Sequence, residues 1–234
     1  KKDLLDDTLI LFCADNGACP FERTRGREFK PWDPKSYWTY DASWAHVGNT
    51  PFRLYKQNQH EGGISSPLIV HWPKGLKTAT GSITRQPGHL IDFMATFVDL
   101  GKAKYSKQVG ERKVDPLQGK SLAPIFAGKT RDPHGTLYFN FGTDRALRQG
   151  DWKLVSAKLG RWELFDLGKD RSETNDLSSK HPERVTAMSK EWFRIAKEVC
   201  RENGKRLAPA GDKLKALNFR KSPGSGKKRK KEKK

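Results

Sequence analysis

The sequence is short of cysteine and of long apolar runs. Its three cysteines, Cys13, Cys19 and Cys200, lack the spacing of a zinc-binding motif, and their odd number leaves at least one thiol unpaired. Pairing of Cys13 with Cys19 depends on the turn between them, so the redox compartment stays open. No apolar stretch approaches the ~20 residues that cross a bilayer, so the sequence predicts no membrane-spanning helix.

Acidic residues are scarce relative to basic ones. The chain has 46 Lys and Arg against 27 Asp and Glu, a net charge of +19. Residues 205–234 alone carry thirteen basic and two acidic residues, and the final KSPGSGKKRKKEKK has no apolar side chain to bury. We therefore expect 205–234 to be a disordered basic tail. Such a tail is either simply solvated or contacts a polyanion such as nucleic acid, anionic lipid or an acidic polysaccharide.

A predicted strand near the start of the chain runs into two oxygen-bearing side chains. Residues 9–17 read LILFCADNG. The apolar run is typical of a strand buried on both faces in the parallel sheet of an α/β protein, where ligands lie at the carboxyl ends of strands. Asp15 and Asn16 stand at that end, and their oxygens suit Ca²⁺ or Mg²⁺. Gly17 permits a sharp turn. A plain Asp-Asn-Gly turn is the alternative.

The chain opens on KKDLLDDTLILF, which has no signal peptide and leads directly into this strand. A central strand needs neighbours on both sides. We therefore expect the 234 residues to be the C-terminal part of a longer protein.

The remaining pattern predicts helices and a second, antiparallel sheet. Residues 18–55 are rich in proline, glycine and aromatics and are expected to form an ordered loop that walls a pocket. Residues 68–70 predict another buried strand, and residues 88–100 a helix. Four short β-type runs between residues 137 and 166 predict a meander. A helix from about Pro182 to Asn203 should pack on it. Its apolar stripe consists of Val185, Met188, Trp192, Ile195 and Val199.

Six stretches of the chain, taken in order, resemble the sulfatase family. They are LILFCADNG at 9–17, NTPFRLYKQNQHEGGISSPLIVHWP at 49–73, QPGHLIDFMATFVDL at 86–100, GKSLAPIFAGK at 119–129, RALRQGDWKLV at 145–155 and WELFDLGKDRSETNDL at 162–177. The sulfatase family comprises formylglycine-dependent hydrolases and belongs to the alkaline-phosphatase-like superfamily. The six stretches look most like the arylsulfatase branch of the family. The resemblance implies an α/β fold in which residues 1–130 are the C-terminal part of the catalytic domain. Residues 131–204 would then be a small subdomain of antiparallel sheet plus helix.

The resemblance also assigns roles to individual residues. In the family, the Asp and Asn of the Asp-Asn-Gly motif bind the active-site cation, usually Ca²⁺, which makes Asp15 and Asn16 the expected metal ligands, with Mg²⁺ as the alternative ion. The Lys five residues before Glu-Gly-Gly binds the sulfate group, which makes Lys56 the expected catalytic and substrate-binding residue. A compact ammonium suits that task because it neutralises charge that moves to the leaving oxygen. His60 is a further candidate for substrate binding at the rim of the site.

One departure from the family pattern concerns the nucleophile. Sulfatases carry a Cys-x-Pro-x-Arg motif, or a Ser version, whose first residue becomes formylglycine. Cys19-Pro20-Phe21-Glu22-Arg23 has its proline one place too early and follows Asp-Asn-Gly at the wrong position. We therefore expect the formylglycine in a preceding part of the complete protein, and the 234 residues to be inactive alone.

The function that the resemblance implies is hydrolysis of a sulfate ester to an alcohol and sulfate. The substrate is a small sulfate ester or a sulfated sugar. Two alternatives stay open, namely a phosphatase or phosphodiesterase of the same superfamily and a non-catalytic polyanion-binding protein. Location in the periplasm or outside the cell is usual in the family and is expected here, whereas the oligomeric state is left open.

Overall fold

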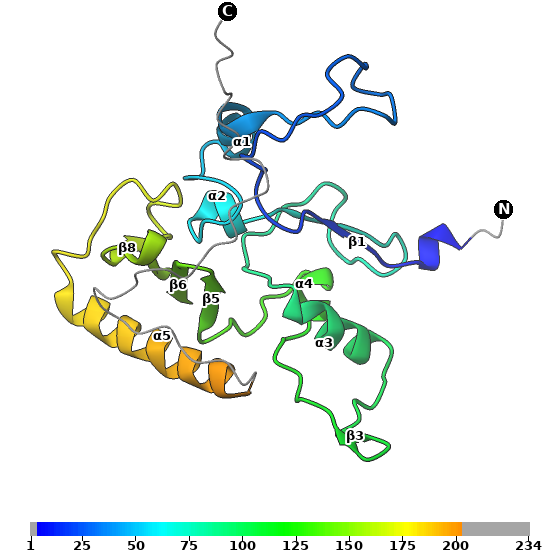
Figure 1. Cartoon of the computed structure of the whole chain (residues 1–234). Coiled ribbons are helices and arrows are strands. Elements are labelled where there is room, and N and C mark those ends of the chain that lie inside the picture. The colour runs from blue at the N-terminus through cyan, green and yellow to red at the C-terminus, as the bar shows by residue number, and fades with distance from the viewer. Residues whose placement is uncertain (1–3, 203–234) are drawn as a thin grey trace, which may run out of the picture. The chain divides into compact units, whose positions relative to one another are not determined.

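The computed structural model describes residues 4–202 (Figure 1). The chain divides into two units, residues 1–192 and 193–234, of which the second is described only for the end of its helix, so the predicted basic tail at 205–234 lies outside the described residues. The predicted boundary between residues 130 and 131 lies inside the first unit and stays a prediction.

The helices, in order, are the 3₁₀ turn η1 (Leu5–Asp7), α1 (Asp41–Asn49), α2 (Glu61–Ile64), α3 (Ile91–Leu100), α4 (Ala123–Phe126), the 3₁₀ turn η2 (Ala157–Leu159) and α5 (Pro182–Glu202). The strands are β1 (Ile10–Cys13), β2 (Leu68–His71), β3 (Gln108–Val109), β4 (Arg112–Lys113), β5 (Leu137–Phe141), β6 (Asp144–Gln149), β7 (Trp152–Ser156) and β8 (Glu163–Asp166).

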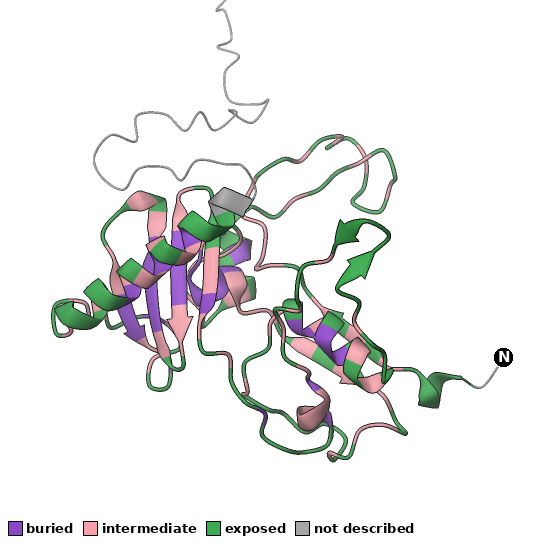
Figure 2. Ribbon diagram, turned by 90° about the horizontal axis from the view of Figure 1, so that it is seen from below, coloured by how far each residue is buried: buried purple, intermediate pink, exposed green. Residues whose placement is uncertain are grey.

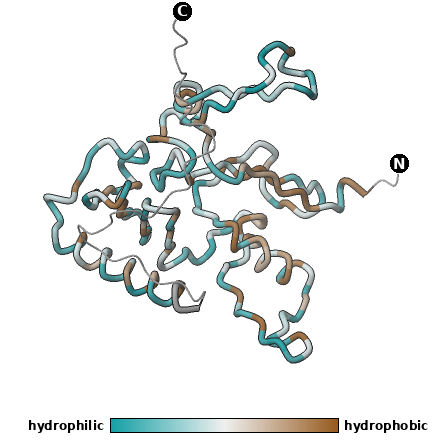
Figure 3. Tube along the Cα trace, in the orientation of Figure 1, coloured by the Kyte–Doolittle hydropathy of each residue, from teal (hydrophilic) through white to brown (hydrophobic). Residues whose placement is uncertain are grey.

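The first strand pair differs from the sequence expectation. β1 and β2 form where they were predicted, but they pair with each other in antiparallel register, with Ile10 opposite His71 and Cys13 opposite Leu68. Neither strand is buried on both faces, because exposed and half-buried positions alternate along each. The pair carries the hydrophobic colour of Figure 3 along its length. Cys13 and Cys19 are both free thiols, so no disulfide joins them.

The segment from residue 88 to 134 is organised around the buried carboxylate of Asp92. Its oxygens accept hydrogen bonds from the backbone N–H groups of His89 and Lys120, each at 2.9 Å. They also pair with Arg131 Nη2 at 2.9 Å and His134 Nε2 at 2.8 Å. Burial alone would raise the pKa of Asp92, but these hydrogen bonds and the guanidinium outweigh it and hold the pKa below its usual value. This single side chain fixes the start of α3 against the chain that follows it.

The apolar residues of α3 lie on its exposed side. Leu90, Met94 and Phe97 are each about half exposed, whereas the buried face consists of Asp92, Ala95 and Thr96. The predicted helix is therefore present, but its interior contacts come from Asp92, Thr96 and the small Ala95 rather than from its large apolar side chains. The helical spacing of apolar residues locates the helix correctly without identifying the face that is covered.

The four-stranded meander contains the core of the first unit. β5, β6, β7 and β8 pair in chain order, every pair antiparallel, as the short β-type runs predicted. Ala146, Val155, Phe165 and Leu167 form a buried cluster, with Phe139 packed against it. Burial is concentrated on these strands in Figure 2. The fold is thus the mixture of helices and sheet, with a separate antiparallel sheet, that the sequence predicted.

The predicted helix after the meander is α5. In the first unit, its residues Met188 and Trp192 are almost completely buried. Trp192 Nε1 donates to the carbonyl of Phe139 at 3.1 Å, and its ring centroid lies 5.3 Å from that of Tyr138. The stripe therefore packs on the meander as expected at these two positions. Among the described residues, no helix combines the length and the apolar character needed to cross a membrane.

Candidate functional site

The turn that follows β1 carries the two predicted metal ligands. The strand ends at Cys13, and Asp15 and Asn16 follow in an irregular bend. The side chain of Asp15 is exposed, and that of Asn16 is half-buried. The two oxygen-bearing groups are therefore accessible at the end of a strand rather than enclosed in the interior.

Three hydrogen bonds hold this turn against residues 49–63. Gly17 N–H donates to the carbonyl of Gly63 at 3.0 Å, and Lys56 N–H donates to the carbonyl of Ala18 at 3.1 Å. The third bond comes from the side chain of Asn49, whose Oδ1 accepts from Ala18 N–H at 3.2 Å. The main chain of Lys56 therefore lies beside that of Ala18, two residues after Asn16. The structure thus places the main chain of Lys56 beside the turn that carries Asp15 and Asn16, and the roles of these three residues stay predictions.

Glycines permit the close approach between the two segments. A Cβ atom on Gly17 would lie 1.8 Å from the carbonyl oxygen of Gly62, and one on Gly62 would lie 2.2 Å from that of Leu54. No side chain fits at either position without displacing backbone. Gly17 was predicted to permit a sharp turn, but its φ is not positive. The reason for glycine here is therefore the contact with Gly62, which presses the Glu-Gly-Gly turn against the end of β1.

Asn49 was not singled out from the sequence, yet it joins both segments. It ends α1, and its amide accepts from Ala18 through Oδ1 while Nδ2 donates to the carbonyl of Leu54 at 3.1 Å. An asparagine at the end of a helix gives no signal of such a role, because the partners are 31 and 5 residues away in the chain.

His60 does not lie at the rim of a site, which corrects the sequence expectation. Its side chain is fully buried, and Nε2 lies 3.2 Å from Oε2 of Glu163 on β8. Burial, followed by the nearby charges of Arg53 and Lys153, lowers the pKa of His60 to about 3. The ring is therefore neutral near pH 7, donates a hydrogen bond to Glu163, and connects α2 to the meander.

A buried ion cluster lies directly behind the Glu-Gly-Gly turn. The ammonium of Lys153 on β7, which is completely buried, lies 2.8 Å from Glu61 Oε1 and 2.9 Å from Glu173 Oε1. Glu61 N–H donates to Glu173 Oε2 at 2.7 Å. Sequence reasoning missed this cluster. The only signal for Lys153 is a charged residue inside a strand of otherwise apolar character.

The two carboxylates of this cluster have pKa values shifted in opposite directions. Burial alone would raise the pKa of Glu61, but the ammonium of Lys153 outweighs it and holds the pKa below its usual value. For Glu173 burial dominates, and its pKa is raised. Glu61 is therefore the firmly ionised partner of Lys153, and Glu173 is the group that takes up a proton more readily. The sequence analysis assigned no such pairing to the Glu-Gly-Gly turn.

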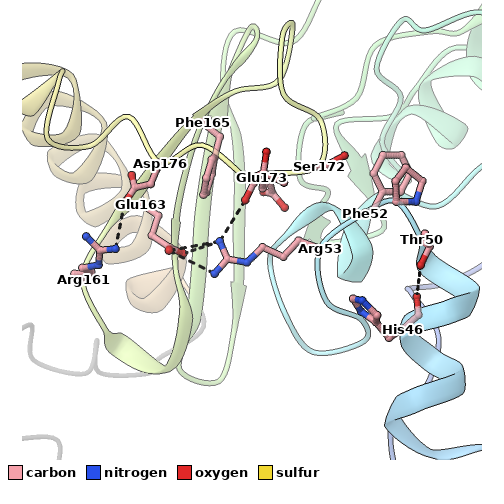
Figure 4. A pocket seen from close by; sticks show the side chains of 12 residues that line it. His46, Thr50, Phe52, Arg53, Arg161, Glu163, Phe165, Ser172, Glu173 and Asp176 are labelled. Atoms are coloured by element: carbon pink, nitrogen blue, oxygen red, sulfur yellow. Dashed lines mark hydrogen bonds and ion pairs between the residues drawn. The ribbon is translucent and has the colours of Figure 1, made fainter.

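A cavity of about 600 Å³ opens beside this cluster but does not include the predicted site residues. His46, Phe52 and Arg53 line one side, and Arg161, Glu163 and Asp176 line the other. Figure 4 shows the guanidinium of Arg53 reaching Glu163, with Nη1 3.4 Å from Oε2. Since Arg53, Glu163 and Arg161 already form ion pairs, we assign the cavity no part in the reaction and take the end of β1 as the candidate site.

The donor set at the end of β1 fits part of a calcium site. A carboxylate and an amide carbonyl are hard oxygen ligands, and Ca²⁺ takes six to eight of them in general. Within residues 4–202, no cluster of three or more His, Cys, Asp or Glu side chains has the arrangement of a metal site. Asp15 and Asn16 therefore have suitable chemistry but make up only two ligands of such a sphere.

Comparison with known proteins identifies the segment that carries this geometry. Residues 1–103, which contain Asp15, Asn16 and Lys56, match the sequence model of the family described as Sulfatase. This match covers somewhat less than half of the chain's 234 residues. The chain is 29% identical over 214 residues to an uncharacterized sulfatase of Schizosaccharomyces pombe. This alignment covers 81% of this chain and 38% of that protein. It is 23% identical to an N-acetylgalactosamine-6-O-sulfatase of Bacteroides thetaiotaomicron, over 80% of this chain and 36% of that one.

Solved structures include chains of similar fold. The crystal structure of a protein named Ps i-CgsB matches with a TM-score of 0.58 and 26% identity, over 82% of this chain and 37% of that chain. The same protein has been crystallised in complex with k-i-k-neocarrahexaose. The chain therefore spans less than two fifths of the length of these sulfatase relatives.

Proposed function

We propose that the protein containing this chain hydrolyses sulfate esters, releasing an alcohol and inorganic sulfate. The observation that carries the proposal is the hydrogen bond of 3.1 Å between Lys56 N–H and the carbonyl of Ala18. The main chain of Lys56 thereby lies beside the turn that bears Asp15 and Asn16, inside the segment that matches the Sulfatase family model, and this supports the proposal.

Asp15 and Asn16 are proposed to hold a divalent cation, Ca²⁺ or alternatively Mg²⁺. Their accessible oxygens at the end of β1 support this role. A cation bound there would neutralise and orient the oxygens of the sulfate group. Ligands beyond these two are required to complete its coordination sphere.

Lys56 is proposed to bind the sulfate group as the catalytic cation of this chain. Its side chain is half-buried, so the ammonium acts in a setting less screened than bulk water. As the sulfur–oxygen ester bond breaks, negative charge moves to the leaving oxygen, and a fixed positive charge stabilises that change. The nucleophile is expected to be a formylglycine, and no residue of this sequence is assigned that role. His60 is left out of the proposal because its side chain is buried.

The substrate class is proposed to be a sulfated sugar rather than a simple aryl sulfate. Ps i-CgsB, a structural relative at 26% identity, was crystallised with a carrageenan-type hexasaccharide, according to the name of its complex. The arylsulfatase type and a location outside the cytoplasm stay predictions from the sequence.

The proposal is tested by turnover of 4-nitrophenyl sulfate by the whole protein, in parallel with 4-nitrophenyl phosphate. Asp15→Ala and Lys56→Ala should each lower kcat/KM for the sulfate ester by about 100-fold or more, because each removes a charge from the reacting group. Asp15→Ala should in addition weaken Ca²⁺ binding in calorimetry.

Matched controls are Asp99→Ala and Lys129→Ala, which remove exposed charges of the same kinds away from the end of β1. Both should leave turnover within about twofold of the parent. Unchanged sulfate turnover in Asp15→Ala or Lys56→Ala would contradict the site assignment. Faster turnover of the phosphate than of the sulfate would favour a phosphatase of the same fold.

A further inference from the structure

A group of exposed aromatic rings lies on the segment between β1 and α1. We call residues 21–44 the aromatic loop, and Figure 1 shows this part of the chain as a blue loop extending away from α1. Trp32 is 81% exposed and Trp44 65%, and Tyr37, Trp38 and Tyr40 are each about half exposed. Exposed rings in this number are costly in water, since each Å² of apolar surface costs about 25 cal/mol. A surface of this kind is typical of a binding site.

The rings are presented by an ordered backbone. Arg25 and Tyr37 form an antiparallel bridge, with hydrogen bonds of 2.9 and 3.0 Å in both directions. Arg23 N–H donates to Thr39 Oγ1 at 2.9 Å, and Trp38 Nε1 donates to the carbonyl of Phe29 at 3.3 Å. The exposure of the rings is thus a property of a hydrogen-bonded hairpin, which lowers the entropy lost when a ligand is bound.

Positive charge is interleaved with these rings. The segment from residue 21 to 40 contains five basic and three acidic residues. All five cationic side chains are exposed, and they are Arg23, Arg25, Arg27, Lys30 and Lys35. Two of the acids are engaged within the loop, because Glu22 accepts from Thr24 N–H and Asp33 from Lys35 N–H, each at 2.8 Å. Glu22 also pairs with Arg27 at 3.6 Å, so Arg27 is partly neutralised. The loop therefore offers flat apolar faces beside accessible cations.

Both ends of the loop are fixed at the candidate site. Ala18, just before the loop, and Asn49, at the end of α1, are joined by the hydrogen bond of 3.2 Å between Ala18 N and Asn49 Oδ1. Ala18 is also the residue whose carbonyl holds Lys56. A polymer with one sulfate group at Lys56 would therefore have its neighbouring units close to the base of the aromatic loop.

We propose that the aromatic loop binds the chain of a sulfated polysaccharide, with rings such as Trp32 and Trp38 stacked on sugar faces and the loop cations paired with sulfate groups. This inference rests on the proposed function, because ester hydrolysis at Lys56 selects a sulfated ligand over other polyanions. Aromatic rings among cations also suit single-stranded nucleic acid, and that alternative is an outcome of the test.

The test measures binding, without turnover, of a carrageenan hexasaccharide to the whole protein by calorimetry. Trp32→Ala combined with Trp38→Ala should weaken binding at least about tenfold, as expected when central aromatic contacts are truncated. Lys30→Ala combined with Lys35→Ala should weaken binding and reduce its dependence on salt. All four side chains are exposed, and the substitutions remove one side-chain hydrogen bond that orders the loop, from Trp38 Nε1 to Phe29, so the thermal midpoint of unfolding should stay close to that of the parent.

Two controls have matched chemistry outside the loop. Phe141→Ala removes a half-exposed ring from β5, and Lys169→Ala removes an exposed ammonium near β8. Neither should change the affinity by more than about twofold. The basic residues at 205–234 are present in every variant, so their contribution to binding cancels.

The outcomes separate this proposal from the proposed function. Hexasaccharide binding that is unchanged in both loop variants overturns the assignment of the loop, even if 4-nitrophenyl sulfate is hydrolysed. Loop-dependent binding of the sulfated sugar supports the assignment even if no ester is hydrolysed, in which case hydrolysis alone fails. Tighter loop-dependent binding of oligo-dT than of the hexasaccharide, or equal binding of the desulfated sugar, overturns the sulfated ligand.

Discussion

Lys153 places a positive charge between two carboxylates in the interior of the first unit. Its ammonium is fully buried, with Glu61 and Glu173 within 2.9 Å. Lys153→Met keeps the approximate length of the side chain but removes the buried cation from both acids, so that Glu61 keeps, within residues 4–202, only Arg171 as an ion-pair partner, at 3.4 Å. We expect this variant to lose about 3–5 kcal/mol of unfolding free energy, measured by denaturant titration.

The control for this prediction is Lys169→Met, since Lys169 is exposed and pairs with Asp166 only at 3.4 Å. It should change stability by no more than about 0.5 kcal/mol. Adding Glu61→Gln and Glu173→Gln to Lys153→Met should restore part of the loss, because no unpaired charge then remains buried. A loss below about 1 kcal/mol in Lys153→Met alone would contradict the buried pairing.

The buried imidazole of His60 predicts a dependence of stability on pH. Burial lowers the pKa of His60 in the folded protein to about 3, while the unfolded chain has the ordinary value of 6.5. Between these values the unfolded state binds the extra proton, so the stability that depends on a neutral His60 is fully present above pH 6.5. That stability is lost as the pH falls toward 3, with a slope approaching about 1.4 kcal/mol per pH unit.

Denaturant unfolding of His60→Gln between pH 7 and pH 4 checks this prediction. The variant should show a shallower fall in stability than the parent, whereas His46→Gln, which removes an exposed ring, should follow the parent. Equal slopes for the parent and His60→Gln would show that another group titrates in this range.

The positions of candidate residues relative to nearby elements were predictable from the sequence, whereas the roles assigned to Asp15, Asn16 and Lys56 remain predictions. The position of Asp15 and Asn16 after a strand, and of Lys56 ahead of two glycines, was read directly from the printed order. The burial of His60 was not, because it depends on Glu163, which lies 103 residues away. Lys153 was missed for the same reason, since its partner Glu61 lies on a different element.

At the scale of elements, α2 is defined by its two glycines. A methyl group at Gly62 would lie 2.2 Å from the carbonyl oxygen of Leu54 and 2.5 Å from that of Arg53. Gly62→Ala should therefore lower the unfolding free energy by about 1–3 kcal/mol and, by shifting the turn, reduce turnover. Gly48→Ala is the matched control. Its added methyl would meet only Ala18 Cβ at 3.8 Å, inside helix α1.

The two alanine variants should change stability in opposite directions. Alanine is favoured over glycine within a helix by about 0.5–1 kcal/mol, so Gly48→Ala is expected to be neutral or stabilising in thermal unfolding. If both variants were equally stable, the close contact of Gly62 with the main chain of Leu54 would be contradicted.

Element identity was predicted better than element surroundings. The meander followed from short β-type runs with glycine between them, a pattern set by local turn chemistry. The apolar run of β1 predicted burial on both faces, yet within residues 4–202 the strand pairs with β2 alone, and Phe12 is 66% exposed. Apolar composition indicates that a strand can be buried, whereas the neighbouring strands determine which faces are covered.

At the scale of the whole molecule, the order of the motif stretches predicted the similarity to sulfatases that the family model finds in residues 1–103, but not the contacts between those stretches. The sulfatase match covers residues 1–103, while the ion cluster joins Glu61 of that segment to Lys153 and Glu173 far outside it. The meander is therefore more than an appended sheet. Its residue Lys153 is the buried cation that pairs with Glu61 in the Glu-Gly-Gly turn. The periodicity of apolar residues along the chain gives no signal of this contact.

The bond between Ala18 and Asn49 closes a stretch of thirty residues at its base. Because a hydrogen bond joins the two ends, we expect changes of sequence or conformation within the stretch to displace Asp15, Asn16 and Lys56 only slightly. Under the proposed function, a stretch closed in this way can be exchanged between related proteins with little displacement of the candidate site. Grafting it into a relative is then expected to transfer the preference for a polymer.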